Sequence, residues 1–498
     1  NCVGPWHKIR KAIPMQRVRP RAALSVLLTT VAVCMLPGCA TTVAGNAVSV
    51  FDDPFKVGGL QAVDGPSGLR PDAEKPTRKV TDGNGGQIDK IAVQSVSDIE
   101  AYWEFAFPET FNDRPFKPVK ALISWDSDAY DGVFCDEETS GLVNAAYCDY
   151  DNTIGWDRGV LLPSLRKANG DMAITMVLAH EYGHAIQKLA HLNKKKTPAL
   201  VSEQQADCFA GVYVRWVAEG NSPRFTVSTG DGLNNLLAGM ISFRDPLLSE
   251  DDYYDGGDEH GSAFERISAF QFGFTDGPSA CAAIDTKEIA ARRGDLPVEL
   301  PSNETGELPV TEESTRSIID AMNILFKPEH PPALTFDEAS AQKCPDARPS
   351  PPASYCPATN TIAVALPELQ KMGTSTADQE NALLQGDNTA YSVLVSRYVL
   401  ALQRQHGGLI LDNAEAGLRT ACMTGVATAR LSKEVTTPDG NTVGLTAGDI
   451  DEAISGLLTN GLVASDVNGE TVPAGFSRID AFRIGVLGDQ DRCIKRFP

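Results

Sequence analysis

The sequence contains no Cys-x-x-Cys spacing, although eleven cysteines are present. That spacing is typical of cysteine-ligated metal sites, so a site of this kind is not expected. Basic residues are also few, with 44 Lys and Arg against 65 Asp and Glu, and the formal net charge is -21. Because so acidic a surface repels phosphates, we expect no nucleic acid partner.

Long apolar runs are missing from the chain beyond residue 39, where none approaches the roughly 18 residues that a membrane-spanning helix needs. Before that point, residues 22–36 form an apolar stretch that is too short for a comfortable span. Arg17, Arg19 and Arg21 precede it and form a basic region. Residues 1–38 are therefore predicted to be an export signal, and the rest of the chain is expected outside the cytoplasm.

The apolar stretch ends in "LPGC", which resembles a bacterial lipobox with Cys39 as its lipidated cysteine. Such a lipid would anchor the chain to the extracytoplasmic face of the cell membrane. An ordinary secretory signal and an uncleaved anchor are the alternatives. Residues 39–88 are rich in Gly, Pro, Asp and Thr and have no sustained periodicity, so we predict a flexible tether, although part of "VAGNAVSVF" is a candidate for packing on the body.

The chain beyond the tether repeats itself. Four stretches recur in the same order at offsets of 208 to 216 residues: 145–157 with 353–365, 177–187 with 393–403, 206–212 with 420–426, and 264–273 with 476–485. We therefore predict two homologous units, 89–290 and 313–498. The Pro- and Glu-rich segment 291–312 between them is predicted to be a linker.

The cysteines of the two units are even in number, which in an exported chain favours disulfides. Two pairs close short loops, and two would be long-range, although a sequence alone does not fix the connectivity. The expected pairs are Cys135–Cys148, Cys208–Cys281, Cys344–Cys356 and Cys422–Cys493.

The stretch "NGDMAITMVLAHEYGHAIQKLAH" (169–191) has the apolar spacing of a helix, with Asp171 as a candidate N-cap. His180 and His184 lie one turn apart on one face, so both imidazoles can reach one metal ion, and Glu181 lies beside them. The alternative is a pair of buried core histidines. Glu203, nineteen residues after His184, is the candidate third ligand.

Asp207 lies one turn beyond Glu203 on the same predicted helix, where a carboxylate can accept the free ring N–H of a ligating histidine. Two solvated acids are the alternative. The second unit lacks all five polar residues while it keeps the apolar frame. This joint loss favours one zinc site in the first unit, because core residues would be needed in both copies. The replacing residues are Ser396, Arg397, Leu400, Gly417 and Ala421.

Residues 89–290 resemble the bacterial neutral zinc metallopeptidases in "HEYGH", "SEQQADCFAG" and "EHGSAFERISAFQFGF". The whole chain, lipobox included, looks like an actinobacterial, mycobacterial-type lipoprotein peptidase of that group. The resemblance implies a gluzincin-type site with zinc on two His and one Glu. It also points to His260 as a donor to the oxyanion, with Val472 at the matching place in the second unit. A solvated loop histidine is the alternative, and Tyr253 and Tyr254 are weaker candidates for the same role.

These observations predict an α+β fold, with a zincin-like catalytic unit followed by a degenerate duplicate. The expected function is hydrolysis of peptide or protein substrates with one Zn²⁺ per chain and Glu181 as general base. The strand at 152–157 is expected either to pair with extended substrate at the edge of the cleft or to be an ordinary sheet strand. The alternatives are a hydrolytically silent zinc-bearing binding lipoprotein and an envelope scaffold that binds through its second unit. The intact Glu181 favours the enzyme.

Overall fold

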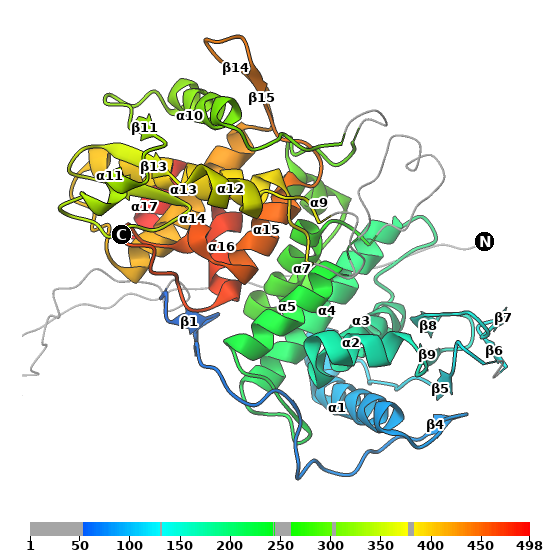
Figure 1. Ribbon diagram of the computed structural model, residues 1–498. Helices are drawn as coiled ribbons and strands as arrows, with labels where there is room; N and C mark the ends of the chain where they lie inside the picture. Colours follow the sequence, from blue (N-terminus) through cyan, green and yellow to red (C-terminus); the bar gives the residue numbers. More distant parts are fainter. Residues whose placement is uncertain (1–52, 130–131, 243, 245–259, 301–304, 377–382) are drawn as a thin grey trace, which may run out of the picture. The chain divides into compact units, whose positions relative to one another are not determined.

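The computed structural model of the chain describes residues 53–129, 132–242, 244, 260–300, 305–376 and 383–498 (Figure 1). Residues from Val48 onward belong to one unit. The predicted export signal, Cys39, Tyr253 and Tyr254 lie outside the described residues. Within the described ranges, no helix has both the length and the apolar character that crossing a membrane requires.

The first half of the described chain combines helices with a four-stranded sheet of order β4-β5-β9-β8, which confirms the α+β class. Strands β4, β5 and β9 run parallel, and β8 is an antiparallel edge strand. The helices are α1 (Gln87–Thr110), α2 (Leu161–Asn169), α3 (Asp171–Ala190), α4 (Ala199–Ala218), α5 (Asp231–Ser242), α7 (Ala263–Asp276), α8 (Pro278–Ala282) and α9 (Thr286–Arg293). The strands are β1 (Lys56–Val57), β2 (Leu60–Gln61), β3 (Gly68–Leu69), β4 (Val80–Thr81), β5 (Ala121–Trp125), β6 (Val133–Phe134), β7 (Glu137–Glu138), β8 (Ala145–Cys148), β9 (Thr153–Asp157) and β10 (Phe225–Thr226).

Helix α3 lies at the centre of this half and packs against α1, α2, α4, α5 and strand β8. Ile174, Leu178 and Ile186 are buried on it, as the helical spacing predicts. The helix begins at Asp171, so the N-cap is Gly170 and not Asp171. Gly170 has φ 80, a conformation that glycine adopts without a steric penalty, and the helix starts one residue earlier than expected.

The segment 53–88 is not a free tether. Its strand β3 pairs with β10, and β4 joins the main sheet beside β5. Val57 is fully buried, and Arg70 donates from Nε to the carbonyl of Phe225 at 2.9 Å. The prediction of a flexible tether over 39–88 is therefore wrong from residue 53 onward. Backbone pairing and side-chain contacts hold this segment to the rest of the first half.

From α10 onward, the second half repeats the main order of elements that the first half has from α1 onward, with α11 in place of β6 and β7 (Figure 1). Its sheet has the order β11-β13-β12, with β11 parallel to β13 and β12 antiparallel, as for β5, β9 and β8. The helices are α10 (Glu312–Phe326), α11 (Ala339–Gln342), α12 (Leu366–Met372), α13 (Asp387–His406), α14 (Ala414–Arg430), α15 (Asp449–Thr459), α16 (Gly475–Val486) and α17 (Gln490–Arg496), with the 3-10 turn η1 (Leu462–Ala464). The strands are β11 (Ala333–Thr335), β12 (Ala353–Cys356), β13 (Thr361–Val364), β14 (Val435–Thr436) and β15 (Thr442–Val443).

Four disulfides have the expected pairing, two in each half. In both halves, a short-range bridge ends in the edge strand, β8 or β12, and a long-range bridge joins the helix after the central one to a short helix near the end of the half. The bridges are Cys135–Cys148, Cys208–Cys281, Cys344–Cys356 and Cys422–Cys493.

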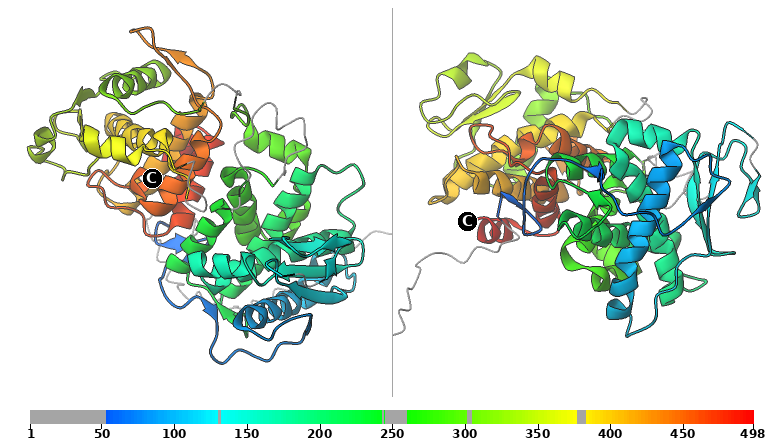
Figure 2. Two further views of the ribbon diagram at one scale, coloured as in Figure 1. Left: turned by 45° about the vertical axis from the view of Figure 1, so that its right-hand side comes forward. Right: turned by 90° about the horizontal axis from the view of Figure 1, so that it is seen from below.

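Helices α5 and α7 of the first half pack against α15 and α16 of the second. The arrangement is reciprocal, because α5 contacts α16 while α15 contacts α7, and α7 also contacts α16. Gln271 on α7 donates from Nε2 to the carbonyl of Phe476 at 3.0 Å and accepts from Arg483 Nε at 3.1 Å. Helix α4 contacts both α3 and α7, so this interface lies one helix away from α4. In the further views of Figure 2, the second half, drawn from yellow to red, lies beside the first.

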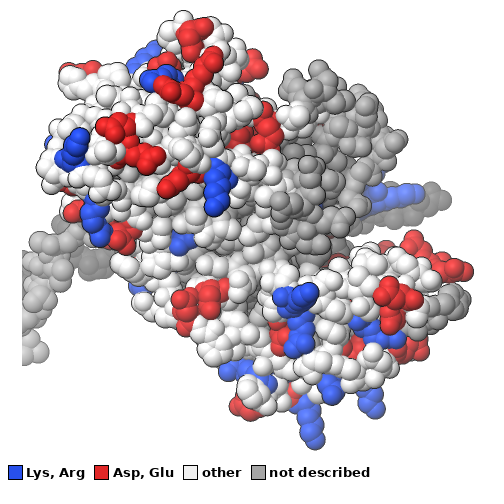
Figure 3. Space-filling model, viewed as in Figure 1, with Lys and Arg blue, Asp and Glu red and all other residues white. Residues whose placement is uncertain are grey.

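The surface carries charges of both signs. On the face drawn in Figure 3, the basic side chains of the described residues are interspersed with acidic ones. The acidic excess belongs to the sequence as a whole, and the expected lack of a nucleic acid partner stays a prediction.

A group of buried carboxylates lies in the second half, where Asp387, Asp449 and Glu452 are each at most 6 % exposed and Glu307 approaches them. Burial raises the pKa of Glu452, and the neighbouring carboxylates raise it further. Burial likewise raises the pKa of Asp387. The folded chain therefore holds protons here that the unfolded chain releases above about pH 4.5.

Since the folded-state pKa lies above the unfolded one, this group is expected to lower stability as the pH rises through neutrality. Glu452→Gln imitates the protonated carboxyl. At pH 8 its free energy of unfolding, measured by urea denaturation, should exceed that of the wild type by at least about 1 kcal/mol, and at pH 5 the two should differ little. Glu434→Gln, at an exposed position, is the control. A Glu452→Gln chain less stable than the wild type at pH 8 would show that the carboxylate is ionised and paired with a cation.

Candidate functional site

The site is built where α3 crosses α4. Gly183 permits the close approach, because a Cβ added there would lie 2.8 Å from the Cα of Ala206. Any larger residue would push the two helices apart. The glycine of "HEYGH" therefore brings the histidines of α3 within reach of the carboxylates of α4.

Three ligand atoms converge at this crossing. The Nε2 atoms of His180 and His184 lie 3.0 and 3.5 Å from the carboxylate oxygens of Glu203. One donor atom from each residue falls within 4.8 Å of the others, a spacing that a single metal ion can bridge. Two imidazoles and one carboxylate are a donor set that zinc commonly takes, and it leaves a fourth position open.

The far side of the His180 ring is held by a buried relay. Asp207 Oδ1 lies 2.7 Å from His180 Nδ1, so the carboxylate accepts that ring proton and Nε2 is left to face the site. Arg266, on α7, donates two hydrogen bonds to the Asp207 carboxylate at 2.8 and 2.9 Å. Asp207 thus has the orienting position that its spacing predicts.

The second histidine is oriented by an amide. His184 Nδ1 lies 3.1 Å from Gln187 Oε1, and Gln187 in turn donates from Nε2 to the carbonyl of Ser202. An amide oxygen that accepts the Nδ1 proton leaves Nε2 as the free ligand atom. Both histidines therefore present the same nitrogen to Glu203.

The charges of the site favour a cation between the histidines and Glu203. Burial alone lowers the pKa of His180, but Asp207 and Glu203 outweigh it and raise the pKa to about 10. The pKa of His184 is raised against the same effect of burial, mainly by Glu203. Burial opposes ionisation of Glu203 and Asp207, yet the histidines lower the pKa of Glu203, and Arg266 with His180 lowers that of Asp207. A dication would find this excess of negative charge already in place, so the donor set fits zinc.

Glu181 points to the edge of the sheet. Its Oε2 accepts a hydrogen bond from the backbone N–H of Tyr147 at 2.9 Å. Tyr147 belongs to β8, whose other edge pairs with β9. The strand at 152–157 is β9 and lies between β5 and β8, so it is an ordinary interior strand and the edge strand facing the site is β8. The sequence left both readings of this strand open, since periodicity does not reveal the order of strands in a sheet.

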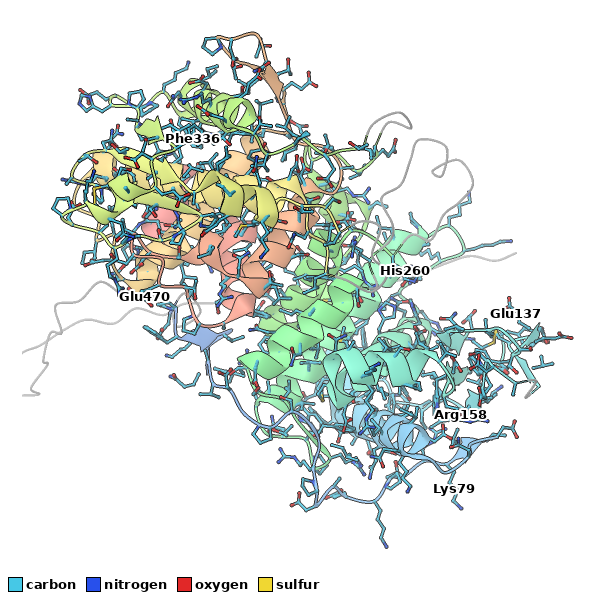
Figure 4. The ribbon with its side chains drawn as sticks, in the orientation of Figure 1. Lys79, Glu137, Arg158, His260, Phe336 and Glu470 are labelled. Carbon is cyan, nitrogen blue, oxygen red and sulfur yellow. A yellow bond between two sulfur atoms is a disulfide. The ribbon has the colours of Figure 1, made fainter. Side chains whose placement is uncertain are left out.

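His260 reaches the site from the loop before α7 (Figure 4). Its Nε2 lies 3.7 Å from Glu203 Oε2, and its side chain is 40 % exposed. It therefore stands at the mouth of the site, where a histidine can approach a bound substrate without being buried among the ligands.

A cavity of ≈ 240 Å³ opens beside the metal ligands. Polar groups lie at one end of it, and its walls are mostly apolar side chains from α2, α3 and α5. They include Leu161, Leu165, Met176, Val177, Leu236 and Met240, and the polar end includes His180, Glu181 and His260.

The matching place in the second half is filled by packed side chains. The residues that replace the two histidines and Glu181 are all fully buried, and Arg397 donates from Nε to the carbonyl of Ala353 on the edge strand at 2.8 Å. Gly417 and Val472 occupy the places of Glu203 and His260. A Cβ added at Gly417 would lie 2.9 Å from Val472, so the two positions are in contact, and Glu203 and His260 likewise lie close together in the first half. No donor set for zinc remains there.

Two further groups among the described residues bring three potential ligands together. One comprises Cys344, Asp346 and Cys356, whose cysteines are joined in a disulfide. The other consists of Glu307, Asp387 and Glu452 in the second half, and neither group contains a histidine.

Sequence reasoning missed the groups that hold the ligands. Arg266 and Gln187 lie within stretches that recur in the second half, as Arg478 and Gln403, so the sequence does not distinguish them from the shared frame. The recurrence indicates structural importance. That Arg266 contacts Asp207 and that Gln187 contacts His184 becomes visible only in the packed structure.

These features form a candidate metal site of the kind found in metallohydrolases, with a His-Glu-x-x-His helix, a glutamate from the next helix and an aspartate beside the first histidine. Residues 53–284 match the family described as "Putative neutral zinc metallopeptidase". The match covers the half of the chain that carries the candidate metal ligands.

The chain is also similar to two curated proteins that are called uncharacterized. It is 33 % identical over 158 residues to YpfJ of Escherichia coli K12, which covers 28 % of this chain and 54 % of YpfJ. It is 26 % identical over 170 residues to Rv2575 of Mycobacterium tuberculosis H37Rv, which covers 30 % of this chain and 58 % of Rv2575. The chain thus spans about half the length of the curated relatives it matches. No solved structure matches the chain.

Proposed function

We propose that the first half is a zincin-like, zinc-dependent peptidase of the gluzincin type, with one zinc ion on His180, His184 and Glu203. The observation that carries the proposal is the convergence of these three ligands within 4.8 Å beside an intact Glu181 at a cleft. A purely structural zinc needs no general base and no open cleft. The second half keeps the fold but not one of these groups, as expected if they serve a reaction and not the core.

Zinc, when bound, supplies the Lewis acidity that polarises a peptide carbonyl and activates a water molecule. Glu181 accepts the proton of the attacking water and delivers it to the leaving amine. Asp207 and Gln187 keep the two imidazoles in the tautomer that presents Nε2. His260 donates a hydrogen bond to the oxygen that gains charge as the carbonyl is attacked.

The substrate is proposed to be an extended peptide that lies along β8. An edge strand can pair with an added strand. The N–H groups of Tyr147 and Ala145 donate to Glu181 and Asn144, so a bound peptide would pair with the carbonyl groups of this edge. The apolar cavity beside Glu181 fits an apolar side chain next to the bond that is cleaved. The polar surroundings of such a pocket would fix the position of the peptide and the apolar walls would select its side chain.

The test is metal analysis together with cleavage of a peptide library by the chain without residues 1–39. We expect one zinc per chain and cleavage beside apolar residues. Zinc without cleavage of any peptide would instead support the silent binding lipoprotein. We further propose that a lipid on Cys39 anchors the chain at the extracytoplasmic face of the membrane, which rests on the "LPGC" sequence alone.

His260→Ala is expected to lower kcat by about 100-fold and to change KM little, because the lost hydrogen bond forms only as the carbonyl oxygen gains charge. The measurement is steady-state cleavage of the best peptide from the library. His191→Ala, at the end of α3, is the matched control. If kcat of His260→Ala equals that of the wild type, another group stabilises the oxygen.

A further inference from the structure

An aspartate of the second half caps a helix of the first. Asp451, on α15, accepts hydrogen bonds from the backbone N–H groups of Ala263 and Phe264 at 3.0 and 2.9 Å. These are the first two residues of α7, and Asp451 is only 3 % exposed. The carboxylate therefore lies buried at the N-terminus of a helix, where the helix dipole and the unpaired N–H groups favour a negative charge.

Helix α7 does not supply these two bonds by itself. Its own capping box pairs Ser262 with Glu265, which satisfies the backbone N–H groups of those two residues. The N–H groups of the two residues between them are left for another acceptor. Asp451 provides both of its carboxylate oxygens to them, so the start of α7 is completed only by the second half.

The start of α7 is connected to the metal ligands on both sides. Three residues before α7 is His260, which faces Glu203. One turn into the helix is Arg266, whose guanidinium holds Asp207, and Asp207 holds His180. A shift of this helix end would move both groups relative to the ligand nitrogens.

The first half makes the corresponding contact in the other direction, but away from the ligands. Asn234, on α5, accepts from the backbone N–H of Gly475 at the start of α16 at 3.0 Å. Asn234 and Asp451 lie 217 residues apart, close to the offset of the other repeated stretches. The two caps are thus related by the internal repeat, yet only that of Asp451 leads to a zinc site, because the site beside α16 has been lost.

We propose that Asp451 is a positioning residue for the zinc site of the first half. By fixing the N-terminus of α7, it keeps Arg266 in contact with Asp207 and His260 in front of Glu203. The half that lost its own ligands thereby contributes to the remaining site. The activity part of this proposal rests on the proposed peptidase function, whereas the metal-binding part does not.

The test compares Asp451→Ala, Asp451→Asn and Asn234→Ala in the full chain. Zinc affinity is measured by competition with a chromophoric chelator, and kcat and KM are measured on a cleaved peptide. Asp451→Ala is expected to weaken zinc binding about tenfold, in the range of lost outer-shell partners, and to lower kcat at least tenfold with KM within about twofold. Asp451→Asn, which keeps one carbonyl acceptor, should recover part of both losses.

Asn234→Ala removes the equivalent cap and should lower the thermal midpoint without changing zinc affinity or kcat. The proposal is overturned if Asp451→Ala binds zinc and cleaves as the wild type does, or if Asn234→Ala loses as much of both as Asp451→Ala does. Should Asp451→Ala fail to fold, Asp451→Asn decides between the same outcomes. A wild type that binds zinc but cleaves no peptide would refute the proposed peptidase, and zinc affinity would still test Asp451.

Discussion

Glu181→Gln is expected to abolish detectable peptide cleavage while zinc stays bound. The amide cannot accept the proton of the attacking water, and general acid–base catalysis contributes about 10² to 10⁴ in rate. The three metal ligands are untouched, and the amide oxygen can still accept the hydrogen bond from Tyr147. The measurement is kcat on a library-derived peptide, with zinc content determined on the same sample.

A matched control for this substitution is Glu104→Gln, at an exposed position of α1. It changes the charge of the chain equally and should leave both kcat and zinc content at wild-type values. Cleavage by Glu181→Gln at the wild-type rate would mean that another group carries the proton, and the mechanism proposed above would be wrong.

Glu203→Ala is expected to lose zinc. Without this carboxylate, only two nitrogen ligands remain, and the negative charge between His180 and His184 is removed. The affinity for zinc should fall by more than the about 10- to 100-fold that the loss of an outer-shell partner costs. Chelator competition measures the affinity, and the zinc content after dialysis gives the stoichiometry.

Glu219→Ala, an exposed position directly after the same helix, is the control and should bind zinc as the wild type does. Wild-type affinity in Glu203→Ala would require a different third ligand. Asp207 does not fit that role as it stands, because its carboxylate is engaged by Arg266 and by the far nitrogen of His180.

The candidate site was largely predictable because its spacing is local. His180 and His184 share a helix face whatever the rest of the fold does, and Glu203 follows on the next helix. The cysteine pairs were predictable as well, since the two halves repeat them. The contact of Asp207 with His180 needed only that α3 and α4 be neighbours.

The remaining features depend on contacts that a sequence does not encode locally. Arg266 is 59 residues from Asp207, and Asp451 is 188 residues from Ala263. The segment 53–88 has strands of only two residues, which leave no periodic signal, so its composition indicated a tether. That β8 and not β9 is the edge strand follows from the order of strands, which depends on long-range pairing.

The reciprocal packing of α5 and α7 against α15 and α16 has the arrangement of an isologous homodimer contact, in which both partners use the same surface. A free dimer of single units would dissociate on dilution, whereas two units in one chain stay paired at any concentration. Covalent linkage also allows the two halves to differ in sequence, because the first half always pairs with the second half and never with another first half. Every molecule of such a chain therefore carries one half with the candidate metal ligands, which a free dimer of two ligand-free units would lack.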